Sequence, residues 1–295
     1  GHPVTSGSPG IDYFVSSSLF ETKTSVLSRN ARAEGNIGDT AWRWGRGDGA
    51  QDFTEQLVLF DSLTASLPEM SGPSNAPDIV ALEVRALTSG LLREDDHAYH
   101  CIQHSKKFHP DFDPVLRGTE HPRTQDFAVL TSKPHNILIV CRTQVHLPRW
   151  ERTLGPDLIQ RLIFLPPLQY PDMLTIVAHC RVMLDTFPWG AGVTSMEALS
   201  AGVPVVTLPA RISVLNLAAG QLTKLGVGGD LIASDVNSMV KAVVKLASDP
   251  LYRERMSAEI LSRKGRLSNP DGPVEEWERF LERAVQSAVR GVAPQ

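Results

Sequence analysis

The side chains best suited to chemistry follow a glycine-containing loop in the second half of the chain. Gly190 and Gly192 lie in this loop, and Thr194, Ser195 and Glu197 come directly after it, in a predicted short helix. Backbone N–H groups in such a loop and at a helix N-terminus bind anions, and the helix dipole favours negative charge there. The hydroxyls suit a phosphate, and the carboxylate, about one turn further on, suits ribose hydroxyls. The stretch therefore predicts a phosphate or nucleotide site.

A structural interpretation of the same glycines stays open. The loop has neither the Gly-Lys-Ser/Thr of a P-loop nor the GxGxxG of a dinucleotide site. Its glycines could serve only to turn the chain sharply between the apolar run that ends at Asp185 and the helix. The two hydroxyls and the carboxylate after the turn favour the anion site.

Alternating apolar runs and helical patterns predict the elements that position these side chains. From about residue 97 the pattern is that of an α/β domain, a Rossmann-like parallel sheet with helices on both faces. The expected strands are 99–103, 137–141, 162–165, 182–185, 205–208 and 230–232. The expected helices are about 111–118, 147–154, 171–179, 193–201 and 213–225. Ligands of such sheets bind beyond the carboxyl ends of the strands. Asp185, the glycine loop and the segment from Gln103 to Lys107 all follow expected strands, so we expect them at one edge.

Composition divides the chain into three expected regions. Residues 1–96 belong to an N-terminal region, with an Arg/Gly-rich loop insertion at about 28–50 and a proline-containing linker at 68–78. Residues 97–268 form the expected α/β domain, and residues 269–295 form a C-terminal helix. Apolar residues recur along this helix at helical spacing, and we expect them to pack against the protein. They are Val274, Trp277, Leu281, Ala284, Val285 and Ala288.

Charge and composition argue against several classes of partner. The 295 residues carry a net charge of −4 and no basic block, which disfavours nucleic acid and anionic membranes. Trp42 and Trp44, beside arginines, form only one short stacking candidate in an acidic chain. Neither an apolar run of about 20 residues nor a metal-ligand spacing is visible. Cys101, Cys141 and Cys180 lie in or beside apolar runs, so we expect buried free thiols in an intracellular protein, cytoplasmic or nuclear.

Six short motifs around the glycine loop, in the correct order, resemble one enzyme family. They are Gly1–Gly7 with the strand after it, Thr54–Val58, Cys101–Asp113, Arg161–Pro166, Leu222–Gly226 and Leu246–Pro250. With the glycine loop they make the chain similar to glycosyltransferase family 41, the O-GlcNAc transferase/SPINDLY group, with gaps at 28–50 and 70–98. The resemblance implies the C-terminal half of a GT-B glycosyltransferase, with the N-terminal half truncated, because the chain opens inside a loop of the family.

The resemblance also implies roles for individual residues. Lys107 matches a family lysine that contacts the donor diphosphate, with Lys106 as the alternative register. Thr194 matches a threonine near the phosphates, and Glu197 matches an aspartate that holds the ribose. The other donor-binding residues expected in the matched segments are Gln103, Gly190, Gly192 and Ser195. The donor implied is UDP-GlcNAc, used without a cofactor or a metal.

The sequence departs from the animal members of the family at several of these positions. Val193 stands in place of a threonine, so one hydroxyl near the phosphates is lost. Tyr170, in the segment that would flank the base, replaces a lysine, and Met173 replaces a histidine. The choice between UDP and GDP as the nucleotide of the donor therefore stays open.

No histidine is carried over as a catalytic base. The family's candidate catalytic histidines lie upstream of residue 1. Within the chain, a structural role is favoured over general-base catalysis for each histidine near the expected site. These are His2, His97, His100, His104 and His109.

Two functions from different classes follow. The first is the nucleotide-sugar-binding half of an inverting, metal-independent transferase that moves GlcNAc to Ser or Thr of proteins. The second is a catalytically incomplete paralogue that acts as a structural or binding subunit of a larger assembly. The expected partners are a nucleotide sugar and either a protein acceptor or an assembly partner that supplies the missing N-terminal half. Lys107, Thr194 and Glu197 favour the first, because a purely structural subunit does not need them.

Overall fold

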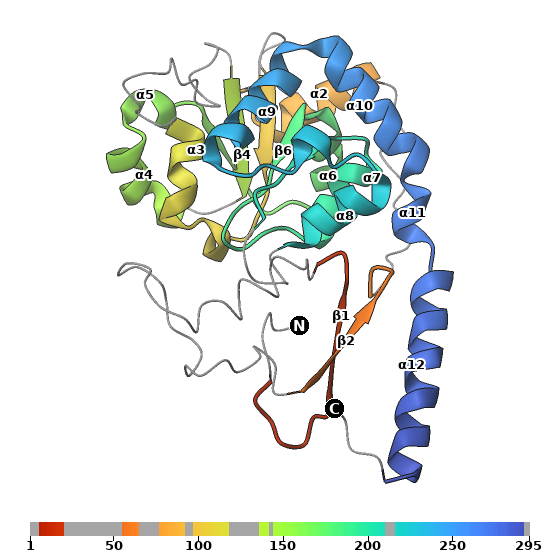
Figure 1. Cartoon of the computed structure of the whole chain (residues 1–295). Coiled ribbons are helices and arrows are strands. Elements are labelled where there is room, and N and C mark those ends of the chain that lie inside the picture. Colours follow the sequence, from red (N-terminus) through yellow and green to blue (C-terminus); the bar gives the residue numbers. More distant parts are fainter. Residues whose placement is uncertain are drawn as a thin grey trace.

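The computed structural model describes residues 6–20, 55–64, 77–91, 97–117, 136–141, 144–209 and 216–291. The predicted insertion at 28–50 therefore lies outside the described residues, and so does the predicted linker at 68–78 except for its last two residues, which begin a helix. Within the described part, two parallel sheets lie one below the other, and a long C-terminal helix runs beside the smaller sheet (Figure 1).

A five-stranded parallel sheet forms the centre of the larger part. Its strand order is β5-β4-β3-β6-β7, the crossover pattern of a Rossmann-like domain. The strands are β3 (His97–Cys101), β4 (Asn136–Cys141), β5 (Leu162–Leu165), β6 (Val182–Leu184) and β7 (Val205–Val206). The predicted α/β fold with a parallel sheet is thus confirmed.

The sixth predicted strand, at residues 230–232, is wrong. Residues Gly229–Leu231 form a 3-10 turn, and only Ile232 makes an isolated bridge, to Thr207. Gly228 starts this turn, and its carbonyl accepts the N–H of Leu231 at 2.8 Å. The glycine pair therefore closes local hydrogen bonds where an extended strand was expected.

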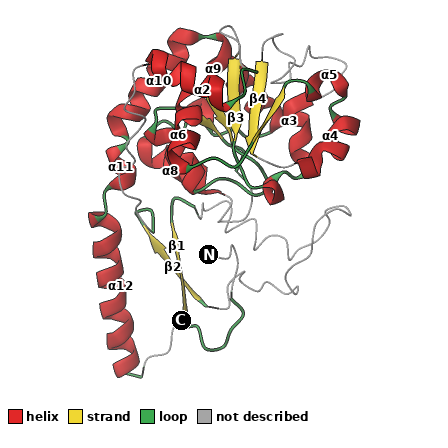
Figure 2. Ribbon diagram, turned by 180° about the vertical axis from the view of Figure 1, so that it is seen from behind, coloured by secondary structure: helices red, strands yellow, loops and turns green. Residues whose placement is uncertain are grey.

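Helices cover both faces of this sheet. On one side α3 packs against α9, and on the other α2 packs against α6, as the two opposite views show (Figures 1 and 2). The helices of this part are α2 (Pro77–Leu87), α3 (Asp113–Arg117), α4 (Leu147–Thr153), α5 (Pro156–Ile159), α6 (Tyr170–His179), α7 (Val193–Ser200), α8 (Leu217–Leu225), α9 (Val236–Ser248), α10 (Pro250–Arg263) and α11 (Gly265–Ser268). The core between them is continuous, so this part forms a single hydrophobic unit.

The smaller sheet pairs β1 (Tyr13–Ser17) with β2 (Gln56–Phe60), and α12 (Asp271–Val289) lies along it. The ring of Phe280 lies 5.2 Å from that of Tyr13, and the ring of Trp277 lies 5.1 Å from that of Phe60. These edge-to-face contacts fasten the C-terminal helix to the N-terminal strands.

Only part of the predicted apolar stripe along α12 packs against the rest of the protein. Val274, Leu281 and Val285 are 51%, 53% and 61% exposed, whereas Phe280, which the stripe left out, makes the main contact. The face that touches β1 and β2 is therefore rotated from the predicted one, toward Phe280 and away from Leu281.

The two parts of the protein meet beside the glycine loop. Asn216 donates from its side chain to the carbonyl of Phe20 at 3.2 Å. The ring of Phe20 lies so close to α8 that a Cβ on Gly220 would be 2.7 Å from it. The N-terminal segment thus packs directly on α8, and the predicted domain boundaries stay predictions.

Candidate functional site

Lys107 is the centre of a chain of polar contacts at the carboxyl edge of the large sheet. It lies in a 3-10 turn just after β3, and its Nζ donates to Gln103 Oε1 and to the Gly190 carbonyl, each at 2.9 Å. Gln103 in turn donates from Nε2 to Thr194 Oγ1 at 2.6 Å. Four predicted site residues from two separate segments, one after β3 and one at the glycine loop, are therefore brought together.

The ammonium group of Lys107 donates its hydrogen bonds to uncharged oxygen atoms. Within the described residues no salt bridge involves its ammonium group, and its two hydrogen-bond partners are an amide and a peptide carbonyl. Burial lowers the pKa of Lys107, and the negative charge of Asp185 opposes this shift. A half-buried cation with neutral partners attracts an anion, because the anion would replace the lost hydration.

Asp185 fixes the glycine loop to the sheet. It follows β6 directly and is fully buried. Its Oδ1 accepts the N–H of Ala191 at 2.6 Å, and its Oδ2 accepts the hydroxyl of Thr207 at 2.7 Å. Burial raises its pKa to about 6, although these hydrogen bonds and Lys107 oppose the shift. The sequence indicated only that Asp185 ends a strand, and its clamp on the loop was missed.

Ser195 has its hydroxyl turned into the protein. The side chain is fully buried and donates to the Gly192 carbonyl at 2.8 Å and to Gln221 Oε1 at 2.7 Å. Gln221 also donates back to the Gly192 carbonyl at 2.9 Å. Ser195 thus stiffens the turn that starts α7. The neighbouring Thr194, which is half-buried, instead belongs to the series of hydrogen bonds around Lys107.

Glu197 and Tyr170 form a second pair at the site. Glu197 is buried in α7, and Tyr170, half-exposed at the start of α6, donates its hydroxyl to the Glu197 carboxylate. Burial raises the pKa of Glu197, and the bond from Tyr170 opposes this. Two predicted residues that would face the ribose and the base therefore lie in contact.

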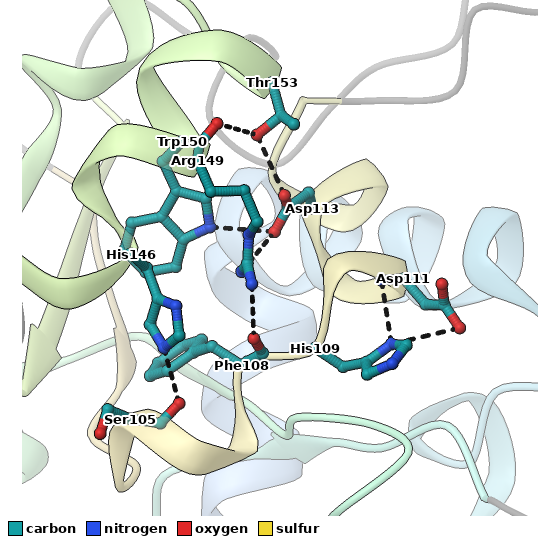
Figure 3. Close-up of polar contacts among 9 residues, drawn as sticks. All are labelled: Ser105, Phe108, His109, Asp111, Asp113, His146, Arg149, Trp150 and Thr153. Carbon is teal, nitrogen blue, oxygen red and sulfur yellow. Dashed lines mark hydrogen bonds and ion pairs between the residues drawn. The ribbon is translucent and has the colours of Figure 1, made fainter.

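A buried cluster supports the segment that carries Lys107 (Figure 3). Asp113 Oδ1 accepts from Arg149 Nη2 and from Trp150 Nε1, both at 2.9 Å. Arg149 also donates to the Phe108 carbonyl at 2.9 Å, and His146 Nε2 lies 2.7 Å from the Ser105 carbonyl. Helix α4 and the 3-10 turn just before it thereby hold the backbone on both sides of Lys107. No local sequence pattern indicated this network.

The described histidines near the site have structural surroundings. His100 in β3 is fully buried, burial lowers its pKa to about 3, and neither ring nitrogen has a hydrogen-bond partner among the described residues. His104 and His109 each cap a 3-10 turn, accepting the N–H of Lys106 and Asp111 at 3.3 Å. Of the other two candidates, His97 begins β3 with a half-buried side chain, and His2 lies outside the described residues.

Searches of the described residues for a metal site and for a membrane span were both negative. No group of three or more His, Cys, Asp or Glu side chains that could hold a metal occurs among them. None of their helices combines the length and the apolar character needed to cross a membrane. Cys101 and Cys180 are buried free thiols, while the side chain of Cys141 lies outside the description.

Comparisons with solved structures agree with this fold. The O-GlcNAc transferase of Thermobaculum terrenum, solved as a mutant, superposes with a TM-score of 0.71 at 19% identity, over 99% of this chain and 48% of that one. The sucrose-phosphate synthase of Thermosynechococcus elongatus gives 0.55 at 12% identity, over 93% and 59%. Anabaena Alr3699/HepE, solved with UDP and glucose, gives 0.51 at 11% identity, over 71% and 53%. The fold is therefore that of a GT-B glycosyltransferase.

Comparisons with sequences show which family of this class the chain resembles. Residues 176–269, which include α7 and the glycine loop, match the model of Glycosyl transferase family 41. The probable UDP-N-acetylglucosamine–peptide N-acetylglucosaminyltransferases SPINDLY of rice and Arabidopsis thaliana are 35% and 40% identical over 123 and 88 residues. These matches cover 41% and 29% of this chain, and 12% and 10% of those proteins. Over these segments the chain is similar to glycosyltransferase family 41, so the resemblance predicted from the sequence is confirmed.

Proposed function

We propose that this chain binds UDP-GlcNAc and forms the donor half of a transferase that moves GlcNAc to Ser or Thr of proteins. The observation that carries the proposal is the ammonium group of Lys107, bound to two neutral oxygens beside the start of α7. A diphosphate placed there would meet the cation, the Thr194 hydroxyl and the N–H groups of the first helical turn. GDP is the alternative nucleotide.

The chemistry asked of these groups is stabilisation of a leaving group. The acceptor hydroxyl would attack the anomeric carbon and give up its proton to a base as the bond from that carbon to the diphosphate oxygen breaks, which inverts the configuration. Negative charge then grows on the departing UDP, and Lys107 would meet it by exchanging its carbonyl partners for phosphate oxygens. The attraction between the ammonium charge and the phosphate oxygens strengthens as negative charge grows on them, so the exchange favours the transition state.

Glu197 and Tyr170 are the proposed contacts to the nucleoside. The Glu197 carboxylate could accept from ribose hydroxyls, and Tyr170, which is 48% exposed, could cover the base with its ring. Because Tyr170 already donates to Glu197, the bound ribose would compete with this bond or share the carboxylate with it. The base preference would then depend on how Tyr170 moves.

The acceptor and the remaining half of the active site are proposed to come from a separate part of the protein or from a partner. The chain spans 48% of the T. terrenum transferase, and no described histidine is placed as a base beside Lys107. The buried free thiols of Cys101 and Cys180 support action in a reducing, intracellular compartment.

Nucleotide-dependent thermal stabilisation tests the proposal. UDP at about 100 times its Kd should raise the free energy of unfolding by roughly 2.7 kcal/mol. Lys107→Ala removes a charged hydrogen bond worth about 1.5–3 kcal/mol, so UDP affinity should fall about 10- to 100-fold. Lys106→Ala, an exposed neighbour, is the matched control and should bind UDP as the native chain does.

Three outcomes would contradict it. If UDP, UDP-GlcNAc and GDP leave the unfolding temperature unchanged, the chain is not the donor half, and the structural-subunit alternative gains support. Unchanged UDP affinity in Lys107→Ala would remove this lysine from the site. An equal loss in Lys106→Ala would mean that the positive charge acts from a different position in the loop.

A further inference from the structure

A pocket lies at the opposite edge of the large sheet from Lys107. It occupies about 370 Å³ where β6 and β7 begin, between the end of α6 and the side of α10. The polar side chains that line it are His179, Arg181, Arg253 and Ser257. Neither an aspartate nor a glutamate is among its lining residues in the described structure.

The positive charges around this pocket repel one another. Burial lowers the pKa of Arg181, and the nearby charge of Arg253 lowers it further, against a smaller opposing effect of Tyr99. Burial, Arg85 on α2 and Arg181 likewise lower the pKa of His179. At neutral pH the pocket therefore has two guanidinium groups and a neutral imidazole on its walls.

A purely structural role accounts for only part of this arrangement. Arg181 donates from Nη1 to the Ala247 carbonyl, and Arg253 from Nη1 to the Leu246 carbonyl, each at 3.1 Å, so both cap the end of α9. A helix C-terminus carries roughly half a negative charge. Since neither guanidinium is in a salt bridge among the described residues, this partial charge offsets only part of their positive charge.

We propose that this pocket binds a small anion with a phosphate group, inorganic phosphate or a phosphate monoester, at a site separate from the donor edge. Guanidinium groups match phosphate oxygens in pairs, and the hydroxyl of Ser257 adds a further donor. The bound anion would join α6, β6 and α10 across the amino edge of the sheet. This proposal stands whether or not the donor site binds UDP.

The probe is inorganic phosphate, with sodium chloride holding the ionic strength constant. Phosphate should raise the unfolding temperature of the native chain, and the ring protons of His179 should shift in the NMR spectrum. The pKa of His179 should rise on binding, because the anion offsets Arg85 and Arg181. Lys107→Ala should respond as strongly as the native chain, which separates this pocket from the donor edge.

Two variants on one helix locate the site. Arg253→Gln should lower phosphate affinity at least tenfold. Arg255→Gln is the matched control, because the guanidinium of Arg255 lies over the Tyr252 ring, 5.3 Å from its centroid, and does not line the pocket. If Arg253→Gln fails to fold, the His179 titration of the native chain still decides.

The outcomes are distinct. A His179 signal and pKa that do not change in phosphate would overturn the proposal, and so would equal losses in the two arginine variants. A response that disappears in Lys107→Ala would place phosphate at the donor edge and also overturn it. Tighter binding of glucose 1-phosphate than of inorganic phosphate would identify a monoester as the ligand, and the reverse would identify free phosphate.

Discussion

The fully buried carboxylate of Asp185 accepts the backbone N–H of Ala191 across a distance of 2.6 Å. This contact fixes the end of β6 to the loop whose Gly190 carbonyl holds Lys107. The shape of the proposed donor site around Lys107 is therefore set by a side chain, Asp185, that would not contact the donor.

The first prediction concerns pH. Burial raises the pKa of Asp185 from 3.8 to about 6, so the carboxylate that holds the loop becomes neutral below that pH. A neutral carboxyl accepts more weakly, and UDP-GlcNAc affinity should fall severalfold between pH 7.5 and pH 5. Asp185→Asn should bind weakly at both pH values. Calorimetric titration at the two pH values measures this, and an unchanged pH slope in Asp185→Asn would show that another group is responsible.

Stability should respond to Asp185 in the opposite direction. Because the pKa of Asp185 is higher in the folded state than in the unfolded state, the folded state binds the carboxyl proton more tightly. Protonation of Asp185 therefore stabilises the folded state below pH 4, and this stabilisation is lost as pH rises through 6. Weaker donor binding at pH 5 would therefore not reflect unfolding caused by this group. Thermal unfolding without nucleotide at both pH values provides the control.

The second prediction restores a hydroxyl. Val193 begins α7 and is 55% exposed, so Val193→Thr adds an oxygen beside the proposed phosphates without disturbing the core. One hydrogen bond is worth about 0.5–1.5 kcal/mol, so UDP affinity should rise about two- to tenfold. Val193→Ala is the size control and should not bind more tightly than the native chain. An unchanged affinity in Val193→Thr would mean that the phosphates lie away from this turn.

The third prediction tests the ribose contact. Glu197→Gln keeps the shape of the side chain and removes its charge, so UDP affinity should fall by about 1 kcal/mol or more. The discrimination between UDP and 2′-deoxy-UDP should shrink at the same time, because one ribose hydroxyl loses its acceptor. Tyr170→Phe frees Glu197 and should leave this discrimination intact. Equal discrimination in Glu197→Gln and the native chain would contradict the assignment.

Much of this arrangement could be predicted from the sequence, because it leaves local signals. Apolar runs marked five strands of the large sheet, and the glycines marked the loop before α7. The contacts of Gln221 with Ser195, and of Arg149 with Asp113, join residues far apart in the chain and follow no periodicity. For that reason Ser195 was expected to face the ligand, whereas its hydroxyl is used inside the protein.

The fourth prediction concerns His100 and folding. Its imidazole is fully buried with both nitrogens unpaired among the described residues, and such a group costs about 1–3 kcal/mol. His100→Leu should therefore raise the free energy of unfolding by about that amount at pH 7.5. Denaturation in urea measures it. A destabilised His100→Leu chain would indicate that the imidazole has a polar partner in solution.

The same residue predicts a second pH effect. The pKa of His100 in the folded state, about 3, lies below the ordinary 6.5. The contribution of His100 protonation to the free energy of unfolding is therefore zero above pH 6.5 and becomes increasingly unfavourable as the pH drops toward 3. Lowering the pH from 6.5 to 5 should cost the native chain about 2 kcal/mol through this group. His100→Leu should lose that part of the slope, and an identical slope in both chains would contradict it.

The contact of α12 with the N-terminal strands has a consequence for synthesis. Glu276 accepts the N–H groups of Asp61 and Ser62, at 2.7 and 3.0 Å, from 215 and 214 residues further along the chain. At about 5–20 residues per second, the ribosome needs roughly 10–40 seconds to cover that interval. During that time β1 and β2 lack the helix that covers them. Their apolar surface therefore stays exposed, and chaperones can bind it, until the last helix emerges.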